Sequence, residues 1–343
     1  MLILGLESSC DETSASVIEV SDDCRERRIV SNIIASQIEV HRLYGGVVPE
    51  IASRAHTEAI TRVTTEALEA AAITPDALDA VAVTCKPGLI GALLVGVAFA
   101  KGFAYRYNKP LIGVNHVHGH AAAAYLAHAD LDAPFLALVA SGGHTSIMDV
   151  RGHTDYVTVG ITRDDAIGEA FDKVARVMGL PYPGGAEMDR LCAEYLRKND
   201  KPPKIKFPSA AINDDTLDFS FSGLKTAVIN HLHTLTQRGE EIDREEIAAA
   251  FTLAVIDAVK KKLGAALDRT GRDTLVIAGG VAANSHLRRA AEELAADRGL
   301  RLRMPPPSLC GDNGAMIAMQ GAFEFMDGNV APLDLGASAT SRR

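Results

Sequence analysis

Three histidines stand close together in the stretch VNHVHGHAAAA at residues 114–124, at the start of a predicted helix. On a helix His116 and His120 share one face, a spacing that allows two imidazoles to bind one metal ion, whereas His118 would point elsewhere. The candidate third ligand is Asp312, at the start of a predicted C-terminal helix. Ordinary packing histidines and a helix-capping aspartate explain the same residues, so both interpretations stay open.

The histidine pair lacks one residue that a metalloprotease needs. In HExxH proteases a glutamate next to the first histidine activates water, and here Val117 occupies that position. Two histidines and a carboxylate leave coordination positions open, so a bound ion could still polarise a phosphate or carboxylate group of a substrate.

A second group of candidate residues lies in LGLESSCDETSASVIEV, residues 4–20, where Glu7, Asp11 and Glu12 crowd a turn between two predicted strands. FLALVASGGHTSIMDV at 135–150 repeats the same order of strand, small polar turn and strand. Turns rich in backbone N–H and hydroxyl donors suit phosphate oxygens. The repeat predicts two similar units whose turns face each other across a cleft, although any two hairpins can look alike.

Two further segments suggest a nucleotide site. In DDAIGEAFDKVARVMGL, residues 164–180, acids open a predicted helix, where Asp164 and Asp165 complement the helix dipole. Asp172 could accept hydrogen bonds from ribose hydroxyls or an amine, or simply pair with Lys173 or Arg176. TLVIAGGVAANSHLRRAAEEL gives a strand, a Gly-Gly turn and a helix, an order common in nucleotide sites and also in ordinary βα turns.

The elements that position these residues alternate along the chain. Alternating apolar residues predict strands, and helical spacing predicts helices, in an α/β order. The strands are expected at 2–7, 14–20, 27–37, 78–84 and 111–114, and the helices at 49–72, at 91–107 and after Val114. Residues 181–225 show little periodicity and are interpreted as an insertion over the cleft.

Composition limits the class of protein. The chain has 343 residues, 47% of them hydrophobic, enough for a substantial core in two lobes. The net charge of -9 would repel a polyanion, so nucleic acid would need a local basic patch; candidates are 197–206, 260–262, and Arg288, Arg289, Arg301 and Arg303. Five scattered cysteines indicate reduced thiols, and the absence of a signal-peptide pattern predicts a cytoplasmic protein with no membrane association.

Taken together, these segments resemble the TsaD (Gcp/YgjD) family, the tRNA N6-adenosine threonylcarbamoyltransferases. The resemblance covers nearly the whole chain and rests on blocks that occur in one order: ESSCDET, YGGVVPEIASR, KPGLIGALLVG, VNHVHGH, VASGGHTS, DDAIGEAFDK, YPGG, LDFSFSGLKTA, AGGVAANSHLR and GDNGAMIA.

The resemblance implies an actin-like ATPase (ASKHA) fold, with two RNase H-like lobes around a nucleotide cleft. The N-terminal lobe is expected to comprise residues 1–112 and 306–343, and the C-terminal lobe residues 113–305, with the insertion at 181–225 covering the cleft.

The implied reaction transfers the threonylcarbamoyl group of threonylcarbamoyl-AMP to the exocyclic amine of the adenosine next to the anticodon, in tRNAs that read codons starting with A, and releases AMP. By resemblance His116, His120 and Asp312 bind the metal, most often Fe(2+), with Zn(2+) as the alternative. The residues implied in binding the adenylate are Val139, Ala140, Ser141, Gly142, Gly143, Asp172, Gly185 and Asn284.

The acids of the first turn receive a role as a hypothesis. One of Asp11 and Glu12 is expected to assist proton removal from the adenosine amine, whereas Glu7, on the strand, is interpreted as structural. His118 stands where bacterial relatives often have glutamate, which removes a carboxylate that could orient an imidazole. Lys86 replaces a common glycine before Pro87-Gly88.

The alternatives on the same fold are an ATP-dependent phosphotransferase or another carbamoyltransferase; a metalloendopeptidase is disfavoured by Val117, and a noncatalytic scaffold by the histidine pair. The resemblance also implies partners besides tRNA: a dimerisation subunit of similar fold (TsaB-like) and a small P-loop ATPase (TsaE-like). The predicted helix at 49–72 is the candidate docking surface.

Overall fold

A computed structural model describes residues 1–212 and 215–340. Their contacts divide them into two compact units. The first contains Met1–Pro134, Val150–Tyr156 and the described residues from Arg303 onward, and the second contains Phe135–Asp149 and Val157–Leu302. The sequence assigns residues 113–134 to the second lobe, whereas the contacts group them with the first unit, because the helix after Val114 packs against the C-terminal helix.

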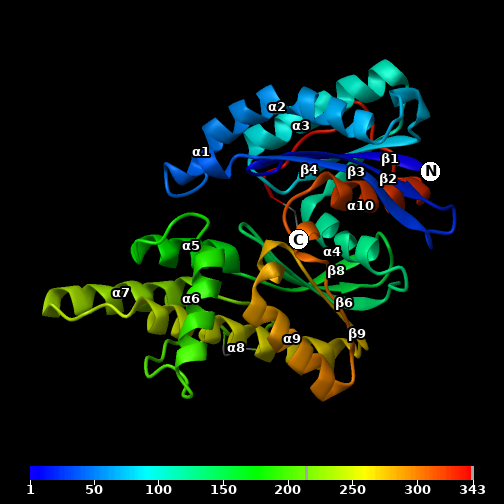
Figure 1. Ribbon diagram of the computed structural model, residues 1–343. Coiled ribbons are helices and arrows are strands. Elements are labelled where there is room, and N and C mark those ends of the chain that lie inside the picture. The colour runs from blue at the N-terminus through cyan, green and yellow to red at the C-terminus, as the bar shows by residue number, and fades with distance from the viewer. Residues whose placement is uncertain (213–214, 341–343) are drawn as a thin grey trace. The chain divides into compact units, whose positions relative to one another are not determined.

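The first unit is built on a five-stranded sheet with the order β3-β2-β1-β4-β5 (Figure 1). β1 pairs antiparallel with β2 and parallel with β4. The strands are β1 (Leu2–Glu7), β2 (Glu12–Val20), β3 (Arg27–Ser36), β4 (Ala80–Lys86) and β5 (Leu111–Asn115). The helices are α1 (Ile38–Arg42), α2 (Pro49–Ala70), α3 (Ile90–Tyr107), α4 (His116–Ala127) and α10 (Gly314–Met326), with short 3-10 turns at Pro75–Ala77 and Pro307–Leu309. These bounds confirm the predicted strands and helices of this region within a few residues.

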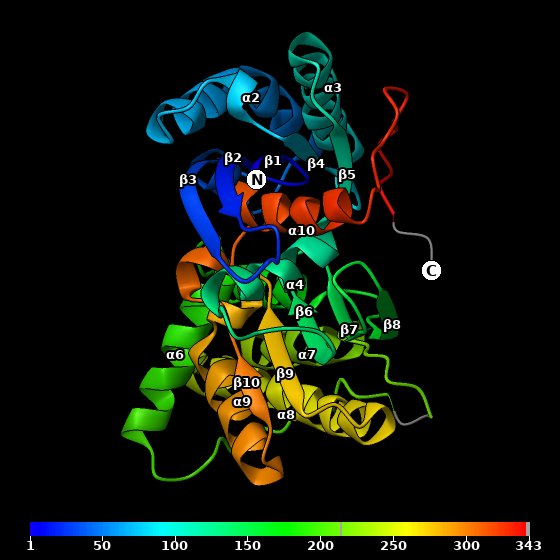
Figure 2. The ribbon, with the colours of Figure 1, turned by 90° about the vertical axis from the view of Figure 1, so that its right-hand side faces the viewer.

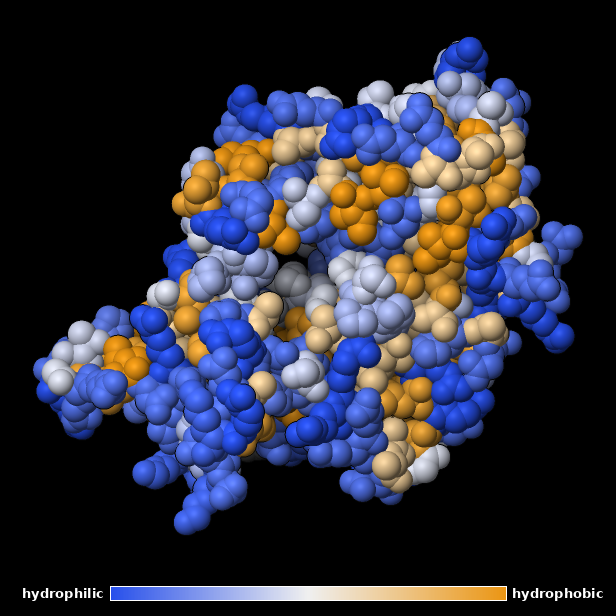
Figure 3. Space-filling model, in the orientation of Figure 1, coloured by the Kyte–Doolittle hydropathy of each residue, from blue (hydrophilic) through white to orange (hydrophobic). Residues whose placement is uncertain are grey.

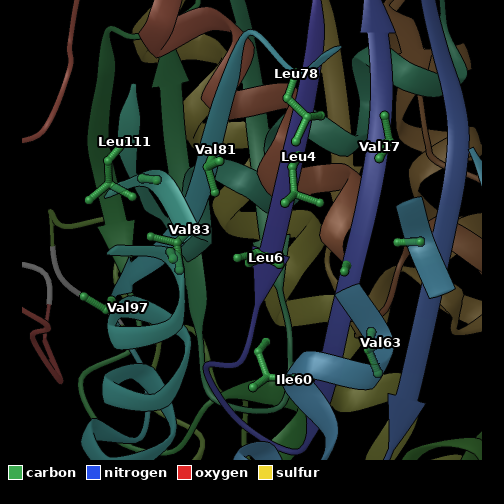
Figure 4. Close-up of a cluster of buried hydrophobic side chains, with 14 of the residues drawn as sticks. Leu4, Leu6, Val17, Ile60, Val63, Leu78, Val81, Val83, Val97 and Leu111 are labelled. Carbon is green, nitrogen blue, oxygen red and sulfur yellow. The ribbon is translucent and has the colours of Figure 1, made fainter. Parts of the chain in front are cut away.

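Helices cover both faces of this sheet. α2 and α3 lie on one face and α10 lies on the other, with α4 against α10 (Figures 1 and 2). Leu4, Val83, Ile60, Val63 and Val97 belong to the apolar cluster that joins the sheet to α2 and α3 (Figure 4). Burying one such aliphatic side chain contributes about 1.5–3 kcal/mol, so this cluster fixes the helices to the strands that carry the site.

A close approach places the start of α10 against β1. A Cβ atom on Gly5 would clash with the carbonyl of Gly314, and a Cβ atom on Gly314 would lie 2.6 Å from the backbone nitrogen of Ser16. Only glycine allows this contact, which brings the residues just before α10 to the end of β1.

The second unit has a five-stranded sheet with the order β10-β9-β6-β7-β8, in which β6 takes the central place that β1 has in the first (Figure 2). The agreement supports the predicted internal repeat. The strands are β6 (Phe135–Ala140), β7 (Thr145–Val150), β8 (Tyr156–Ile161), β9 (Thr274–Ala278) and β10 (Arg301–Arg303). The helices are α5 (Ile167–Val177), α6 (Gly184–Lys198), α7 (Ser222–Arg238), α8 (Arg244–Thr270) and α9 (Ser285–Arg298), with a 3-10 turn, η2, at Gly280–Ala283.

Residues 181–225 are more regular than expected. α6 occupies Gly184–Lys198 and buries Met188, Leu191, Cys192 and Tyr195, which are spaced as on one helical face. The prolines and glycines before it obscure this periodicity in the sequence. That the segment covers a cleft stays a prediction.

Asp164 and Asp165 are structural, but not as helix-dipole acids, because α5 begins only at Ile167. Asp164 accepts hydrogen bonds from the backbone nitrogens of Phe221 and Ser222, at the start of α7. Asp165 pairs with Lys173 and Lys225. Both acids therefore join α5 and α7 across a long stretch of sequence.

Candidate metal centre and nucleotide pocket

The histidine pair and Asp312 come together in the first unit. His116 is the first residue of α4, and Asn115 caps this helix by accepting a hydrogen bond from the backbone nitrogen of Val117. Oδ1 of Asp312 lies 3.2 Å from Nε2 of His120 and 3.7 Å from Nε2 of His116. One ligand atom from each residue lies within 4.8 Å of the others, so the three side chains can hold one metal ion.

Asp312 is available for this role because another residue caps α10. Asn313 is the N-cap, and its side chain accepts a hydrogen bond from the backbone nitrogen of Met316 at 3.0 Å. The interpretation of Asp312 as a helix cap is therefore wrong. Its side chain, 16% exposed, faces the two imidazoles instead.

Glu7 is the residue whose role the sequence missed. It is fully buried at the end of β1, where it accepts a hydrogen bond from Thr84 Oγ1 at 2.7 Å and lies 3.0 Å from Nδ1 of His116. The carboxylate beside an imidazole, expected to be missing because residue 118 is histidine, is thus present and comes from β1. A strand glutamate and a helix histidine give no joint signal in the sequence, so only the folded chain pairs them.

The electrostatics of this cluster favour a positive charge. Burial lowers the pKa of His116, but the carboxylates of Asp312 and Glu7 raise it more, to about 9. Burial raises the pKa of Glu7, but the neighbouring His116 lowers it by more, so the net effect is a decrease. Nε2 of His120 is buried without a hydrogen-bond partner among the described residues. A buried imidazole nitrogen without a partner, close to a carboxylate, fits a metal ion.

Asp11 lies in the turn after β1, and Glu12 is the first residue of β2. The Asp11 backbone carbonyl accepts a hydrogen bond from Gln37, and Glu12 accepts one from Ser36 Oγ at 3.1 Å. Burial, together with the charges of Asp11 and Asp312, raises the pKa of Glu12 to about 9. Three carboxylates thus gather on the side of the cluster where a cation would relieve their repulsion.

His118 packs away from the cluster, as its helical position predicts. Its ring stacks on Tyr156 with the centroids 4.0 Å apart. Burial, and then the charge of Lys86, lower the pKa of His118 to about 4, so the ring is neutral at physiological pH. The substitution at residue 118 therefore leaves the ligand set intact.

A cavity of about 370 Å³ lies in the second unit. Four of the predicted adenylate-binding residues line it, namely Gly142, Asp172, Gly185 and Asn284. α5, α6 and α9 all begin at this cavity, so the positive dipole ends of three helices lie beside it. Helix amino termini bind phosphate groups, which makes the cavity suitable for a nucleotide.

The other predicted adenylate residues do not line the cavity. Val139 and Ala140 are buried in β6, and the Ser141 carbonyl accepts a hydrogen bond from the backbone nitrogen of Gly168. Gly143 is exposed. The lining residues that the sequence analysis missed are Gly168, Phe171, Pro183, Ala186, Asp189, Gly280, Val281 and Ala283.

Two carboxylates at the cavity accept hydrogen bonds from the first residues of helices. Asp172 Oδ1 accepts a hydrogen bond from the backbone nitrogen of Gly184 at 2.7 Å. Asp189 accepts hydrogen bonds from the nitrogen and Oγ of Ser285, at 3.1 and 3.0 Å. Lys173 forms ion pairs with Asp165 and Glu169. It therefore does not form the alternative pair with Asp172. Both acids can accept hydrogen bonds from ribose hydroxyls.

The first glycine of the Gly-Gly turn after β9 is required for steric reasons. Gly279 has a φ of +91°, and a Cβ atom there would clash with the carbonyl of Ala140 in β6. This close approach brings η2, with Gly280, to the cavity wall.

Several cations of the predicted basic patches have structural partners. Lys260 pairs with Glu293, Arg301 with Asp273 and Arg303 with Asp130. Lys262 is buried and donates to the carbonyls of Ile212 and Thr216. In the 197–206 segment Lys198 pairs with Glu245. These contacts favour structural roles for the clusters.

The five cysteines are free thiols, four of them buried, which confirms the expectation of reduced residues. None of the helices in the described part of the chain has the length and apolar character of a membrane span.

The fold and the site define an α/β protein of the ASKHA type, with a candidate His-His-Asp metal centre in one unit and a nucleotide-sized cavity in the other. HypF from T. kodakarensis is similar in structure, with a TM-score of 0.62 and 13% identity over 97% of this chain and 49% of that one. The (R)-2-hydroxyglutaryl-CoA dehydratase component A from Acidaminococcus fermentans gives a TM-score of 0.56 and 16% identity, over 94% of this chain and 98% of that one. At these identities the likeness concerns the fold alone.

Sequence comparison decides the family. The model of the TsaD family, described as tRNA N6-adenosine threonylcarbamoyltransferase, matches residues 28–319. The enzyme of that name from Moorella thermoacetica is 52% identical over 336 residues, covering 98% of this chain and 95% of the relative. The one from Clostridium perfringens (strain 13 / Type A) is 48% identical over 341 residues, covering 99% and 98%.

The chain therefore belongs to the TsaD family and is an acyltransferase that modifies adenosine in tRNA. This result favours the transferase over the phosphotransferase, metalloendopeptidase and scaffold alternatives. tRNA is its macromolecular substrate.

Proposed function

We propose that the acyl donor is threonylcarbamoyl-AMP and that its adenylate binds in the cavity of the second unit. The observation that supports this is the convergence of three helix amino termini with two fixed carboxylates, Asp172 and Asp189. The N–H groups suit the phosphate and the carboxylates suit the ribose. The acceptor is the exocyclic amine of the adenosine next to the anticodon, in tRNAs reading codons that start with A. AMP leaves as a stabilised phosphate.

His116, His120 and Asp312 are proposed to bind one divalent ion, Fe(2+) or Zn(2+). Imidazole and carboxylate donors suit both metals. When bound, the ion supplies Lewis acidity and positive charge next to the carboxylates of the first turn. The residues themselves confine a cation to a buried position, because His116 and His120 are at most 4% exposed.

One of Asp11 and Glu12 is proposed to assist proton removal from the attacking amine. The base must be ionised, and burial, followed by repulsion from Asp11 and Asp312, opposes this by raising the pKa of Glu12. A cation held at Asp312 would lower that pKa and so favour the ionised form of Glu12. General-base assistance of this kind contributes about 10²–10⁴ in rate.

The test of this function measures the product nucleoside. Cells depleted of the protein are rescued with wild type, His120→Ala or Glu12→Gln, and threonylcarbamoyladenosine in their tRNA is quantified by mass spectrometry. Rescue by wild type alone supports the reaction and both groups of residues. In a matched assay, purified protein is mixed with threonylcarbamoyl-AMP and unmodified tRNA; wild-type protein that forms no product with its partners present would refute the proposed donor.

A dimerisation subunit of similar fold and a small P-loop ATPase are proposed as partners, and α3 supports a docking surface next to the predicted one on α2. α2 exposes mainly charged side chains, such as Arg54. α3 carries exposed apolar residues on one side, with Ile90 48%, Leu94 52% and Tyr105 77% exposed. Hydrophobic patches are visible over the α1–α3 region in Figure 3. An apolar stripe of this kind suits a partner helix. Because tRNA is the substrate, we place the reaction in the cytoplasm.

A further inference from the structure

Glu7 is a buried carboxylate that the proposed reaction does not use as a metal ligand. It is 0% exposed, in the last position of β1, among apolar core residues of the same strand. Burying a carboxylate costs several kcal/mol unless its oxygens receive hydrogen bonds. The residues that satisfy it therefore show what it does.

Both oxygens of Glu7 have partners. Oε1 accepts a hydrogen bond from the backbone nitrogen of Ser9, and Oε2 accepts one from Thr84 Oγ1 at 2.7 Å. Oε2 also lies 3.0 Å from Nδ1 of His116. The Ser9 hydroxyl lies 3.1 Å from the same nitrogen and can either donate or accept. An ionised carboxylate only accepts, so the contact with Glu7 requires the proton on Nδ1, and the Ser9 hydroxyl is then a second acceptor. In the neutral ring Nε2 then has the free lone pair.

This orientation directs the free nitrogen toward the other ligands. Nε2 of His116 lies 3.7 Å from Oδ1 of Asp312, the oxygen that lies 3.2 Å from His120. His116 is the first residue of α4. His120 lies one turn further in, and its Nδ1 has no hydrogen-bond partner in the described structure. Of the two rings, His116 is the one that another element holds.

We infer that Glu7 is a positioning residue for the metal centre: it fixes the ring of His116 with Nδ1 as donor, so that Nε2 faces Asp312. The inference rests on the proposed metal site and deepens it. Glu7 also links this ring to the turn after β1, because the same carboxylate accepts from Ser9, two residues before Asp11. The ligand ring and the catalytic turn are thereby held by one side chain.

The test measures Zn(2+) affinity of the purified, metal-free full chain by competition with a chelating dye. Glu7→Gln keeps the shape and removes the charge, and we expect about 10–100-fold weaker Zn(2+) binding, the usual effect of losing such a partner. Thr84→Val keeps the carboxylate and should weaken binding only a few-fold, which provides a second variant if Glu7→Gln unfolds. Ser16→Ala is the control, because Ser16 is equally buried and its hydroxyl donates only to the Ser31 carbonyl in the same sheet.

A second measurement separates positioning from stability. In the Zn(2+)-bound protein, proton–nitrogen correlation spectra of the histidine rings should show His116 with its proton on Nδ1 in wild type and a changed or exchanging signal in Glu7→Gln. Unchanged affinity and tautomer in Glu7→Gln, with only a lower melting temperature, would overturn the inference and leave the metal site standing. Wild-type protein that binds Zn(2+) no better than His120→Ala would overturn both.

Discussion

Oδ1 of Asp312 lies 3.2 Å from Nε2 of His120, although His120 belongs to α4 and Asp312 precedes α10, far away in the chain. The contact depends on Asn313 capping α10 and on two glycines that let this helix approach β1. The carboxylate of Asp312 does not cap α10 and therefore faces two imidazoles.

Replacement of His120 tests the ligand set. His120→Ala should lose Zn(2+) binding and should reduce threonylcarbamoyl transfer by more than the ~10–100-fold typical of outer-shell changes. His118→Ala, in the same helix turn, removes a ring that stacks on Tyr156 and should retain both. Equal losses in the two variants, measured by metal competition and single-turnover transfer, would argue against the assigned ligands.

Chelation should act like His120→Ala, but reversibly. Treatment of wild-type protein with a strong chelator is expected to abolish transfer, and Fe(2+) or Zn(2+) should restore it in proportion to the metal bound. The His120→Ala protein should show no such recovery. Full activity at less than one tenth of an equivalent of metal, by atomic emission, would contradict a required ion.

Glu12→Gln should raise the stability of the protein and lower its transfer activity. Its pKa is raised to about 9, so the native state holds a proton that the unfolded chain releases near its ordinary pKa of 4.5. That contribution to stability is complete below pH 4.5 and is lost as the pH rises toward 9. Glu12→Gln is neutral throughout, so its free energy of unfolding should exceed that of wild type by an amount that grows over this range, about 1 kcal/mol or more at neutral pH.

The measurement is denaturant unfolding of metal-free protein at several pH values, together with transfer rates. Transfer should fall about 10²–10⁴-fold in Glu12→Gln. Lower stability of the variant at pH 8, or an unchanged transfer rate, would disagree with the proposed environment or role of Glu12.

A larger side chain at Gly185 should close the cavity. Gly185 lines it and has no atom within 4 Å of its Cβ position, so Gly185→Leu enters open space without backbone strain. We expect AMP affinity to fall about tenfold or more, equivalent to about 1.4 kcal/mol, by calorimetric titration. Gly223→Leu is a matched control, because Gly223 is also the second residue of its helix, has equally open space and lies outside the cavity lining. AMP binding that is the same in both variants would place the nucleotide elsewhere.

The apolar side of α3 should be needed for assembly. Leu94→Asp puts a charge into the proposed contact and should weaken binding of the similar-fold subunit by an order of magnitude or more, since burying an unpaired charge is costly. Val177→Asp, at a comparably exposed position of the second unit, should not change it. Light scattering of the mixed proteins measures the complex, and equal behaviour of the two variants would exclude this surface.

The sequence by itself determined the order of the strands and the longer helices in the first unit, because alternating and helical apolar periodicity are local properties that the tertiary structure retained. It also determined the pairing of His116 with His120, since four residues of helix fix that spacing, and Asp312 as the candidate third ligand. The motif blocks identified the family before any coordinates. Helix α6 was not predicted, because the prolines and glycines that precede it obscure the periodicity of its apolar face.

Only the tertiary structure decided which carboxylate does what. Glu7 on a strand, Asp312 before a helix and Asp164 before another are alike in sequence, yet they orient an imidazole, face two imidazoles and cap α7, respectively. Asp189 of α6 lines the cavity and accepts a hydrogen bond from Ser285 at the start of α9, a contact that only the folded chain shows. A carboxylate takes its role from the donors that reach it, and these come from segments whose proximity is set by packing, not by neighbouring positions in the chain.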